Sequence, residues 1–409
     1  MEKSTIITDG GTMDDCLWSN LPPEIVIDVL YRLPVKSLCR FKCVSPSWKT
    51  LISSPHFAQT HHRRITGSDN PPYKAILFSS SKDIHTLDFA DANPTPKKLN
   101  LPSSLFNHMD QGSKSLSFCN GLVLVSDDYY FNLLLNPSTC EYKELPAPFG
   151  DYYYDDILEQ PVLFFYDDIL EQPVLGYDSY ADDYKVVLLV HMNGNPGYMY
   201  DVAVYSLKTD AWRMIQELPA SPVKDCRGVC FNERIHWLCE STDVWMMTNY
   251  YGVRESLDYS RVVVAFSLAD EIFTEVPLPA LGDCHECSGH HMVVLGGCLS
   301  LLVWSEPERI DVWMMMNYGV RESWSKFSTT YPGWSIVDVL CLSTQDELVL
   351  GRKRLTDVRT ILPFEFEGDK LSLYNPKEGT WRDAVVPGFP PKSLVGDHYI
   401  ETLVSPNRG

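Results

Sequence analysis

The spacing of apolar residues separates a short helical part of the chain from a long strand-rich part. Within residues 16–62, Ile25, Val29, Leu30 and Leu33 follow one another at intervals that place them along one face of a helix. Beyond residue 75 the pattern changes to alternating apolar and polar residues with frequent turn signals, which is typical of strands. The sequence therefore predicts a small all-α block followed by a large all-β domain.

Proline and serine residues mark the ends of the predicted helices. Pro34 ends the first helix, because its ring removes a backbone donor and clashes with the preceding turn. Ser45-Pro46 and Ser54-Pro55 each place a capping serine before a proline at the first helical position. Two further helices are therefore expected to begin at these sites.

A weak repeat runs through the strand-rich part. Each copy contains an apolar strand, an Asn or Ser, a turn, and an aromatic residue six positions after the Asn or Ser. The pairs are Asn136 and Tyr142, Ser206 and Trp212, Ser267 and Phe273, and Asn375 and Trp381, and a looser fifth copy ends at Trp324. The spacing predicts β-hairpins whose aromatic residues pack in the core rather than forming a binding platform.

A second set of hairpins precedes most of these copies. The predicted turns are Asn120-Gly121, Asn232-Glu233, Gly296-Gly297 and Gln345-Asp346. Two hairpins form a four-stranded sheet, and such sheets in a ring form a β-propeller. "YNPKEGTW" and "YSLKTDAW" resemble kelch hairpins, although most units lack the kelch glycine doublet. We therefore expect a kelch-like β-propeller over residues 75–404, with the number of blades left open.

The segments outside these two domains are polar. Residues 1–15 show no helical or strand pattern and are expected to form a disordered tail. Residues 63–74, "RRITGSDNPPYK", combine charged residues with Gly and Pro and are expected to form a linker.

Two near-identical duplications do not follow the propeller repeat. "YDDILEQPVL" occurs at 154–163 and again at 166–175, and a "DVWMM" segment occurs at 243–256 and again at 311–323. The unit that holds the first "DVWMM" copy is much longer than its neighbours, so we expect residues 243–259 to be an insertion in a loop. One "YDDILEQPVL" copy is interpreted in the same way. Natural insertion and sequence artefact both remain open.

The composition limits the classes of function. The 409 residues contain 34 Lys and Arg against 54 Asp and Glu, a formal net charge of −20. This charge disfavours nucleic-acid and anionic membrane partners, and no apolar run is long enough to span a bilayer. The 12 cysteines are scattered, the N-terminus has no signal-peptide pattern, and proline occupies the middle of both Asn-x-Ser/Thr matches. We therefore expect a reducing compartment, the cytoplasm and/or the nucleus.

One short block departs from the acidic composition. Residues 29–64 contain no acidic residue but seven basic ones, Arg32, Lys36, Arg40, Lys42, Lys49, Arg63 and Arg64. This block is expected to form an electrostatically distinct docking face for an acidic partner. The alternative is a solvated helix face without a binding role.

The run "LPPEIVIDVLYRLPVKSLCRFKCVSPSWKTLISSPHF" resembles an F-box, with its paired Leu-Pro signals and a tryptophan at the expected place. This resemblance implies docking on a Skp-type adaptor and, through it, on a cullin and RING ubiquitin ligase. It assigns adaptor binding to Leu21, Pro22, Ile25, Leu30, Leu33, Pro34, Leu38, Arg40, Val44 and Trp48. A helical block this small cannot bury all its apolar residues alone, so some must face a partner or the second domain.

The strand-rich part resembles the plant F-box-associated interaction domain, which also occurs in S-locus F-box proteins. The resemblance is carried by "SFCNGLVLVSD", "VAVYSLKTDAWRMI" and "VVVAFSLADEIFTEVPLP" in the family's order. It implies a substrate receptor of an SCF-type ubiquitin ligase that binds a target protein and performs no bond chemistry itself. The acidic surface favours a basic target, and pollen self-incompatibility is one role found in the family. The alternatives are a non-degradative F-box scaffold and a kelch-propeller enzyme.

The remaining motifs give no catalytic or metal assignment. "CHECSGHH" (284–291) crowds four zinc-type ligands together without a second ligand pair, so a structural loop is favoured. The acidic and tyrosine-rich tracts, among them "SYADDYK" (179–185), lack a partnering base, so solvated loops are favoured over acid–base chemistry. No phosphate-binding, nucleophile-elbow or zinc-protease motif is present. We therefore expect no catalytic residues, metal or cofactor, and the sequence leaves the target-binding residues unassigned.

Overall fold

The computed structural model divides the chain into two compact units, the helical unit, Met1–Ser68, and the propeller unit, Asp69–Gly409. The described residues are 22–68, 73–78, 83–88, 95–102, 105, 114–127, 132–148, 172–191, 200–223, 227–240, 261–281, 289–306, 309–330, 334–342, 347–354, 370–385 and 394–407. The predicted tail, 1–15, lies outside them.

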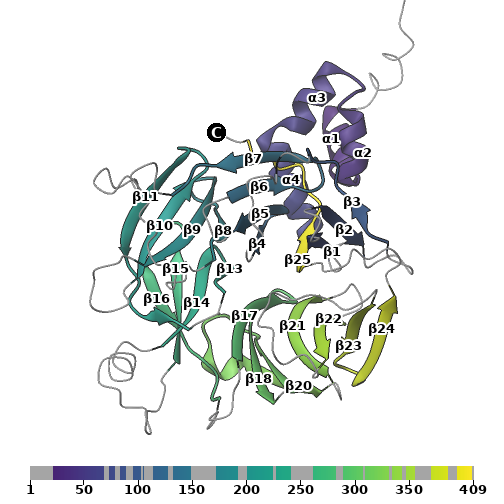
Figure 1. Ribbon diagram of the computed structural model, residues 1–409. Helices are drawn as coiled ribbons and strands as arrows, with labels where there is room; N and C mark the ends of the chain where they lie inside the picture. The colour runs from purple at the N-terminus through teal and green to yellow at the C-terminus, as the bar shows by residue number, and fades with distance from the viewer. Residues whose placement is uncertain are drawn as a thin grey trace, which may run out of the picture. The chain divides into compact units, whose positions relative to one another are not determined.

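The helical unit consists of α1 (Pro23–Tyr31), α2 (Val35–Phe41), α3 (Pro46–Ser53) and α4 (Pro55–Thr66) (Figure 1). Both predicted serine caps are confirmed, because Ser45 Oγ accepts from the Trp48 N–H and Ser54 Oγ from the Phe57 N–H, each at 3.2 Å. No helix in the described part of the chain is long and apolar enough to cross a membrane.

The last helix is longer than the sequence predicted. Helix α4 continues to Thr66, so the first four residues of the expected linker, 63–66, are helical, and β1 already begins at Tyr73. The Arg64 guanidinium lies 2.6 Å from the Asp28 carboxylate and 4.9 Å from the centre of the Tyr31 ring. These contacts with α1 favour one more helical turn, whereas the polar composition with Gly and Pro predicted a linker from residue 63 onward.

The described strands form six antiparallel sheets. The first contains β25 (Leu394–Ile400), β1 (Tyr73–Phe78), β2 (Ile84–Asp88) and β3 (Lys97–Lys98), in that order. The second contains β4 (Lys114–Cys119), β5 (Leu122–Asp127), β6 (Asn132–Asn136) and β7 (Glu141–Leu145), and the third β8 (Val174–Asp178), β9 (Asp183–His191), β10 (Tyr200–Ser206) and β11 (Ala211–Glu217). The fourth contains β12 (Ser221–Pro222), β13 (Val229–Phe231), β14 (Arg234–Glu240), β15 (Arg261–Ser267) and β16 (Phe273–Val276). The fifth contains β17 (Gly289–Leu295), β18 (Cys298–Glu306), β19 (Arg309–Met315) and β20 (Trp324–Thr330), with the short helix η3 (Arg321–Ser323) before β20, and the sixth β21 (Trp334–Leu342), β22 (Leu348–Arg354), β23 (Lys370–Asn375) and β24 (Thr380–Val385).

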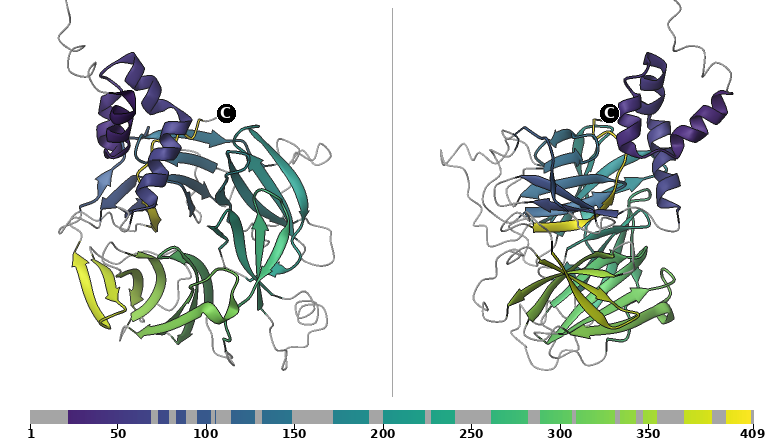
Figure 2. Two further views of the ribbon diagram at one scale, coloured as in Figure 1. Left: turned by 180° about the vertical axis from the view of Figure 1, so that it is seen from behind. Right: turned by 90° about the vertical axis from the view of Figure 1, so that its right-hand side faces the viewer.

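The six sheets form a closed ring (Figures 1 and 2). Their inner strands contact one another in the order β25, β4, β8, β13, β17 and β21, and β21 contacts β25. Apolar clusters lie between the faces of neighbouring sheets, for example between the third and fourth, where Val204 and Trp237 are buried. The predicted β-propeller fold is therefore confirmed.

The ring closes through the two ends of the propeller unit. Strand β1 pairs antiparallel with β25, the last strand of the chain. The Lys74 ammonium lies 2.6 Å from the Glu401 carboxylate, just after β25. The buried Asn136 side chain in the second sheet donates to the carbonyl oxygens of Thr402 at 3.0 Å and Val404 at 2.6 Å. The C-terminal tail therefore ties the first sheet to the second.

The predicted repeat forms the outer hairpin of four sheets, where the Asn or Ser closes the turn. Its carbonyl oxygen accepts from the N–H four residues later at 2.8–2.9 Å in each copy. Its side-chain oxygen accepts from N–H groups inside the turn, as Asn136 does from Ser138 and Ser206 from Thr209. In each of these turns, the residue four positions after the Asn or Ser has a positive φ. These residues are Cys140, Asp210, Glu271 and Gly379. This four-residue turn explains the constant spacing.

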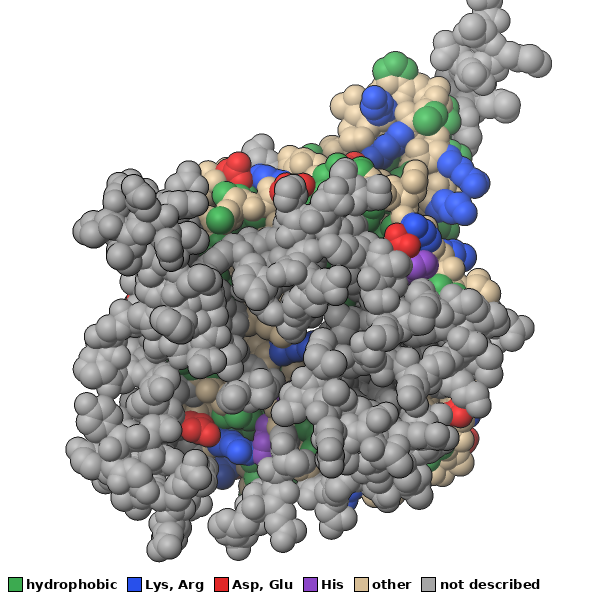
Figure 3. All heavy atoms as spheres, viewed as in Figure 1, with side chains coloured by type: hydrophobic (Ala, Val, Ile, Leu, Met, Phe, Trp, Pro, Cys, Tyr) green, Lys and Arg blue, Asp and Glu red, His purple; other side chains and the backbone are tan. Residues whose placement is uncertain are grey.

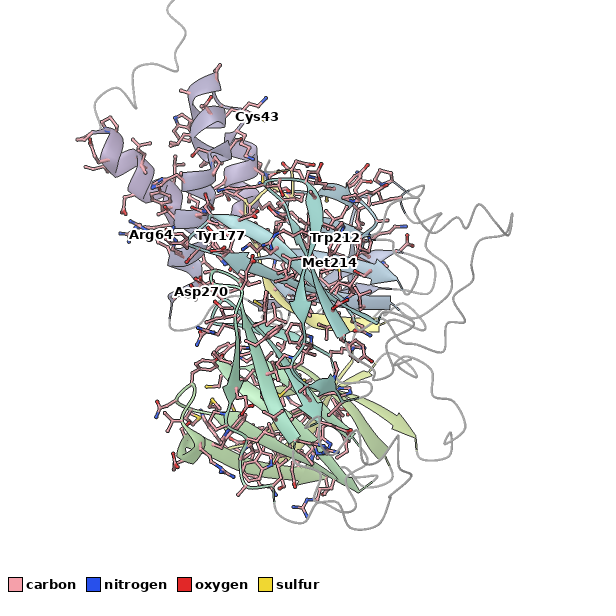
Figure 4. All side chains as sticks on the ribbon, turned by 90° about the vertical axis from the view of Figure 1, so that its left-hand side faces the viewer. Cys43, Arg64, Tyr177, Trp212, Met214 and Asp270 are labelled. Carbon is pink, nitrogen blue, oxygen red and sulfur yellow. The ribbon has the colours of Figure 1, made fainter. Side chains whose placement is uncertain are left out.

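The repeat aromatics pack as predicted. Each lies opposite the residue before the Asn or Ser, as in the pair Tyr205 and Trp212, whose ring centroids are 5.4 Å apart. Trp212, labelled in Figure 4 on the outer strand β11, also donates from Nε1 to the Pro146 carbonyl of the preceding sheet at 2.7 Å. Trp324 repeats this contact with Pro277 at 2.9 Å. Trp212 and Trp324 therefore join neighbouring sheets at the outer edge.

Three of the four predicted inner turns lie in the described chain and join paired strands. Asn120-Gly121 joins β4 to β5, Asn232-Glu233 joins β13 to β14, and Gly296-Gly297 joins β17 to β18. Gln345-Asp346 lies outside the described residues, between the paired strands β21 and β22.

The second copies of the duplicated segments take part in the propeller. Residues 311–323 form most of β19 and the turn into η3, and the last two residues of 166–175 begin β8. The first copies, 154–163 and 243–256, and the predicted insertion 243–259 lie outside the described residues. Glu240 is the last residue of β14 and pairs with Arg261, the first residue of β15. The segment between them therefore connects two adjacent strand ends.

Buried His236 is expected to make stability depend on pH. Burial lowers its pKa to about 4, against about 6.5 in an unfolded chain, so the unfolded state binds more protons between these values. The free energy of unfolding should fall as the pH drops from 6.5 towards 4, by about 1.4 kcal/mol per pH unit from this residue. Denaturant titrations of the wild type and His236→Gln at several pH values check this. Equal pH dependence in the two proteins would contradict it.

Candidate docking surface of the helical unit

Helix α1 exposes part of its apolar surface to solvent. Ile25 and Val29, one turn apart on the same side of the helix, are 49% and 47% exposed. Leu30, the next residue, is buried. The predicted apolar stripe is therefore divided, with Leu30 in the core of the unit and Ile25 and Val29 on an exposed outer ridge.

Further exposed apolar groups lie around the second helix. Val44, in the turn between α2 and α3, is 57% exposed, and Pro22 and Pro34, which precede α1 and α2, are also exposed. Leu33 and Trp48 are half-buried, and the Trp48 ring stands edge-on to Phe41 with centroids 5.5 Å apart. Figure 3 shows hydrophobic side chains beside Lys and Arg side chains on the surface of this unit.

Two of the ten predicted adaptor-binding residues face inward. Leu30 and Leu38 are 1% and 0% exposed, alongside the buried Ile52 and Phe57. Helical periodicity places these two residues on the buried faces of α1 and α2. They therefore pack in the core of the unit and are not part of its exposed surface. Leu21 lies outside the described residues.

The basic block contains two kinds of cation. Arg32 and Arg64 lie 2.9 Å and 2.6 Å from the carboxylate of Asp28, one residue before the block begins. Hydrogen bonds from Arg64 and then Arg32 lower the pKa of Asp28. The other five, Lys36, Arg40, Lys42, Lys49 and Arg63, form no ion pair with the part of the chain that the structure describes.

Sequence reasoning assigned Arg40 to docking but not Val29. Arg40 is exposed, beside no carboxylate in the described chain, and is available to a partner. Val29 was predicted only as part of the helical stripe. Residues four apart lie on the same side of a helix, so the position of Val29 relative to Ile25 is the signal that places both on the exposed ridge. Ile25, Val29, Val44 and Arg40 are called the docking positions below.

Among the described residues, the groups that could support other chemistry do not converge. His290 and His291 are neighbours in β17 and lie on opposite faces, His290 against Arg261 and His291 edge-on to the Trp304 ring. Cys284 and Cys287 lie outside the described residues. In the acidic tract at 179–185, Asp182 accepts from the Tyr177 hydroxyl and Asp183 from Ser206. These two carboxylates therefore stabilise turns and strand ends.

Comparison with known domain families assigns both units. Residues 18–60 match the F-box domain, and residues 76–353 match the F-box associated beta propeller domain. The second match covers more than half of the chain and spans strands of all six sheets.

Similar curated proteins come from Arabidopsis thaliana. The F-box protein CPR1 is 30% identical over 88% of this chain and 85% of that protein. The F-box/kelch-repeat protein At3g23880 is 28% identical over 95% of this chain and 96% of that protein. The F-box protein At3g07870 is 27% identical, covering 91% and 88% of the two chains. The similarity therefore includes both units.

Proposed function

Because this chain belongs to the plant F-box proteins with an F-box associated β-propeller domain, we propose that it is the substrate-recognition subunit of an SCF-type ubiquitin ligase. The helical unit binds a Skp-type adaptor, which connects it to the cullin and RING subunits. The propeller unit binds the protein to be ubiquitinated.

The exposed docking positions carry this proposal. Ile25, Val29 and Val44 each leave close to half or more of their side chains in water, where a partner can cover them. Covering them on an adaptor would contribute about 25 cal/mol per Å² of apolar surface removed from water. Arg40 and the neighbouring unpaired lysines attract an acidic adaptor and orient it during encounter.

The receptor needs no catalytic residues of its own. By holding a target near the conjugating enzyme, it raises the local concentration of the acceptor lysine and replaces a bimolecular encounter with a tethered one. The proposed compartment is the cytoplasm and/or the nucleus, in accord with the free thiols of the described cysteines. The family resemblance alone supports a role in pollen self-incompatibility, and no feature of the described residues favours that role over other targets.

The second candidate function is a non-degradative F-box scaffold. It uses the same docking positions and the same propeller, and it differs only in leaving the abundance of the bound protein unchanged. A kelch-propeller enzyme is less well supported, because the titratable groups described above are engaged in turns and contacts between sheets.

Adaptor binding is the experiment that tests the proposal. Purified full-length protein mixed with a recombinant Skp-type adaptor should elute from a sizing column as one complex of equal stoichiometry. Separate elution at micromolar concentrations of both proteins would remove the proposed function.

A further inference from the structure

A pocket of about 380 Å³ lies between the fourth and fifth sheets of the propeller unit. Its polar residues are Arg261 at the start of β15, Glu275 in β16 and Arg321 in η3. Val276, Pro277 and Leu278 form an apolar wall beside them. The volume lies within the range of about 300–1,000 Å³ found for ligand sites.

Arg261 is held at this pocket by a neutral histidine. Its Nη1 lies 2.5 Å from Nε2 and 2.8 Å from Nδ1 of His290, whose side chain is 4% exposed. Burial, reinforced by the charge of Arg261, lowers the pKa of His290 to about 3, so this imidazole is uncharged at pH 7. His290 therefore fixes the position of the guanidinium without neutralising it.

The charge of Arg261 has no counterion among the described residues. Its Nε is buried and makes no hydrogen bond, and no carboxylate of the described residues lies within ion-pair distance of its guanidinium. A guanidinium carries five N–H donors, and leaving such a donor buried and unpaired costs free energy. An anion in the pocket would supply a counterion for this guanidinium.

A second arginine faces the same space. Arg321 is exposed in the turn between β19 and β20 and likewise forms no ion pair with the described chain. The two arginines reach the pocket from neighbouring sheets, so a bound anion would join the fourth sheet to the fifth. Arginine pairs suit planar oxyanions, because the guanidinium donates two parallel hydrogen bonds.

We propose that this pocket binds a carboxylate group of the target protein, with Arg261 and Arg321 as its donors. This inference rests on the proposed function, because it assigns the chemistry by which the propeller unit recognises its target. The carboxylate comes from an acidic side chain or from a free C-terminus, and the apolar wall accommodates a neighbouring apolar side chain.

The local charge favours a carboxylate over a phosphate group. Two arginines and Glu275 give the pocket a net charge of about +1, which one carboxylate neutralises and a phosphate dianion exceeds. The formal charge of −20 on the whole chain further opposes a dianion. The pocket thus has the opposite sign to the overall surface, and the basic target expected from composition would bear an acidic contact residue here.

Fluorescent peptides test this site in the full-length protein. One probe carries an internal Glu followed by Leu with both ends blocked, a second replaces Glu by Gln, and a third carries a C-terminal Leu with a free carboxylate. The variants are Arg321→Gln and Arg261→Gln. Lys97→Gln removes the same charge from an exposed site in the first sheet and is the matched control. Inorganic phosphate at constant ionic strength is the competitor.

The expected result is binding of the Glu or the free-carboxylate peptide to the wild type and to Lys97→Gln, weakened about tenfold in each arginine variant. Whichever of these two peptides binds identifies the source of the carboxylate. Equal binding of the Gln peptide, unchanged binding in Arg321→Gln, no binding of any peptide, or full displacement by phosphate would overturn the inference. Adaptor binding is measured on the same preparations, since its loss would remove the proposed function, whereas lost peptide binding with intact adaptor binding removes only this site.

Discussion

Replacing Ile25 and Val29 together by alanine should weaken adaptor binding by at least about tenfold, measured by titration calorimetry with the full-length protein. The two changes remove five carbon atoms from an exposed ridge, and each buried methylene contributes about 0.8 kcal/mol. A loss of only about 1.4 kcal/mol corresponds to tenfold weaker binding. The substitutions affect exposed side chains in a helix, so the stability of the free protein should change little.

The propeller unit offers a matched control for this pair. Ile272 and Val320 are 51% and 44% exposed, close to Ile25 and Val29, and they lie in turns of the fourth and fifth sheets. Their double alanine variant should bind the adaptor as the wild type does. Similar affinity losses in both double variants, or in neither, would contradict the assignment of docking to the helical unit.

Gly121→Ala should strongly destabilise the propeller unit. A Cβ atom at this position would lie 2.3 Å from the Ile400 carbonyl oxygen and 2.6 Å from Thr402 Cγ2. It would push the C-terminal tail away from the second sheet, at the junction that closes the ring. Overpacking of this kind costs about 1–3 kcal/mol, and a non-glycine residue at φ +79° costs about 1–2 kcal/mol more.

Gly297→Ala separates these two effects. Gly297 occupies the corresponding inner turn of the fifth sheet with φ +72°, and no atom lies within 4 Å of the position that an alanine Cβ would take there. Denaturant titration should show Gly297→Ala losing only the backbone contribution, while Gly121→Ala loses about 1–3 kcal/mol more. Equal losses would show that the tail does not hold the ring at this point.

The repeat allowed the propeller to be predicted because one local turn recurs. Asn136 and Ser206 each accept hydrogen bonds from backbone N–H groups within the next four residues. The six-residue spacing to Tyr142 and Trp212 therefore follows from local hydrogen bonding. The ring closure left no such local pattern. The contacts from Asn136 to Thr402 and Val404 join residues far apart in sequence, and no periodicity indicates them.

The docking residues were predicted only in part, because motif positions do not distinguish exposed from buried side chains. Leu30 and Leu38 match the motif as well as Ile25 does, yet packing of the short helices buries the first two and leaves Ile25 in water. The arginine pocket is also non-local, since Arg261, His290 and Arg321 come from different strands and a turn. Sequence reasoning weighed His290 as a zinc ligand and favoured a structural loop, whereas His290 lies in β17.

The proposed function requires that this protein deliver a bound target for ubiquitination. The most direct measurement compares proteins captured by the full-length wild type with those captured by the Ile25→Ala/Val29→Ala variant in plant cells, together with their ubiquitination and abundance. Both proteins should capture the same targets, and only the wild type should increase the ubiquitination of those targets and lower their abundance. Capture of the same proteins with equal ubiquitination and equal abundance in the two cases would contradict the proposed function and favour the scaffold.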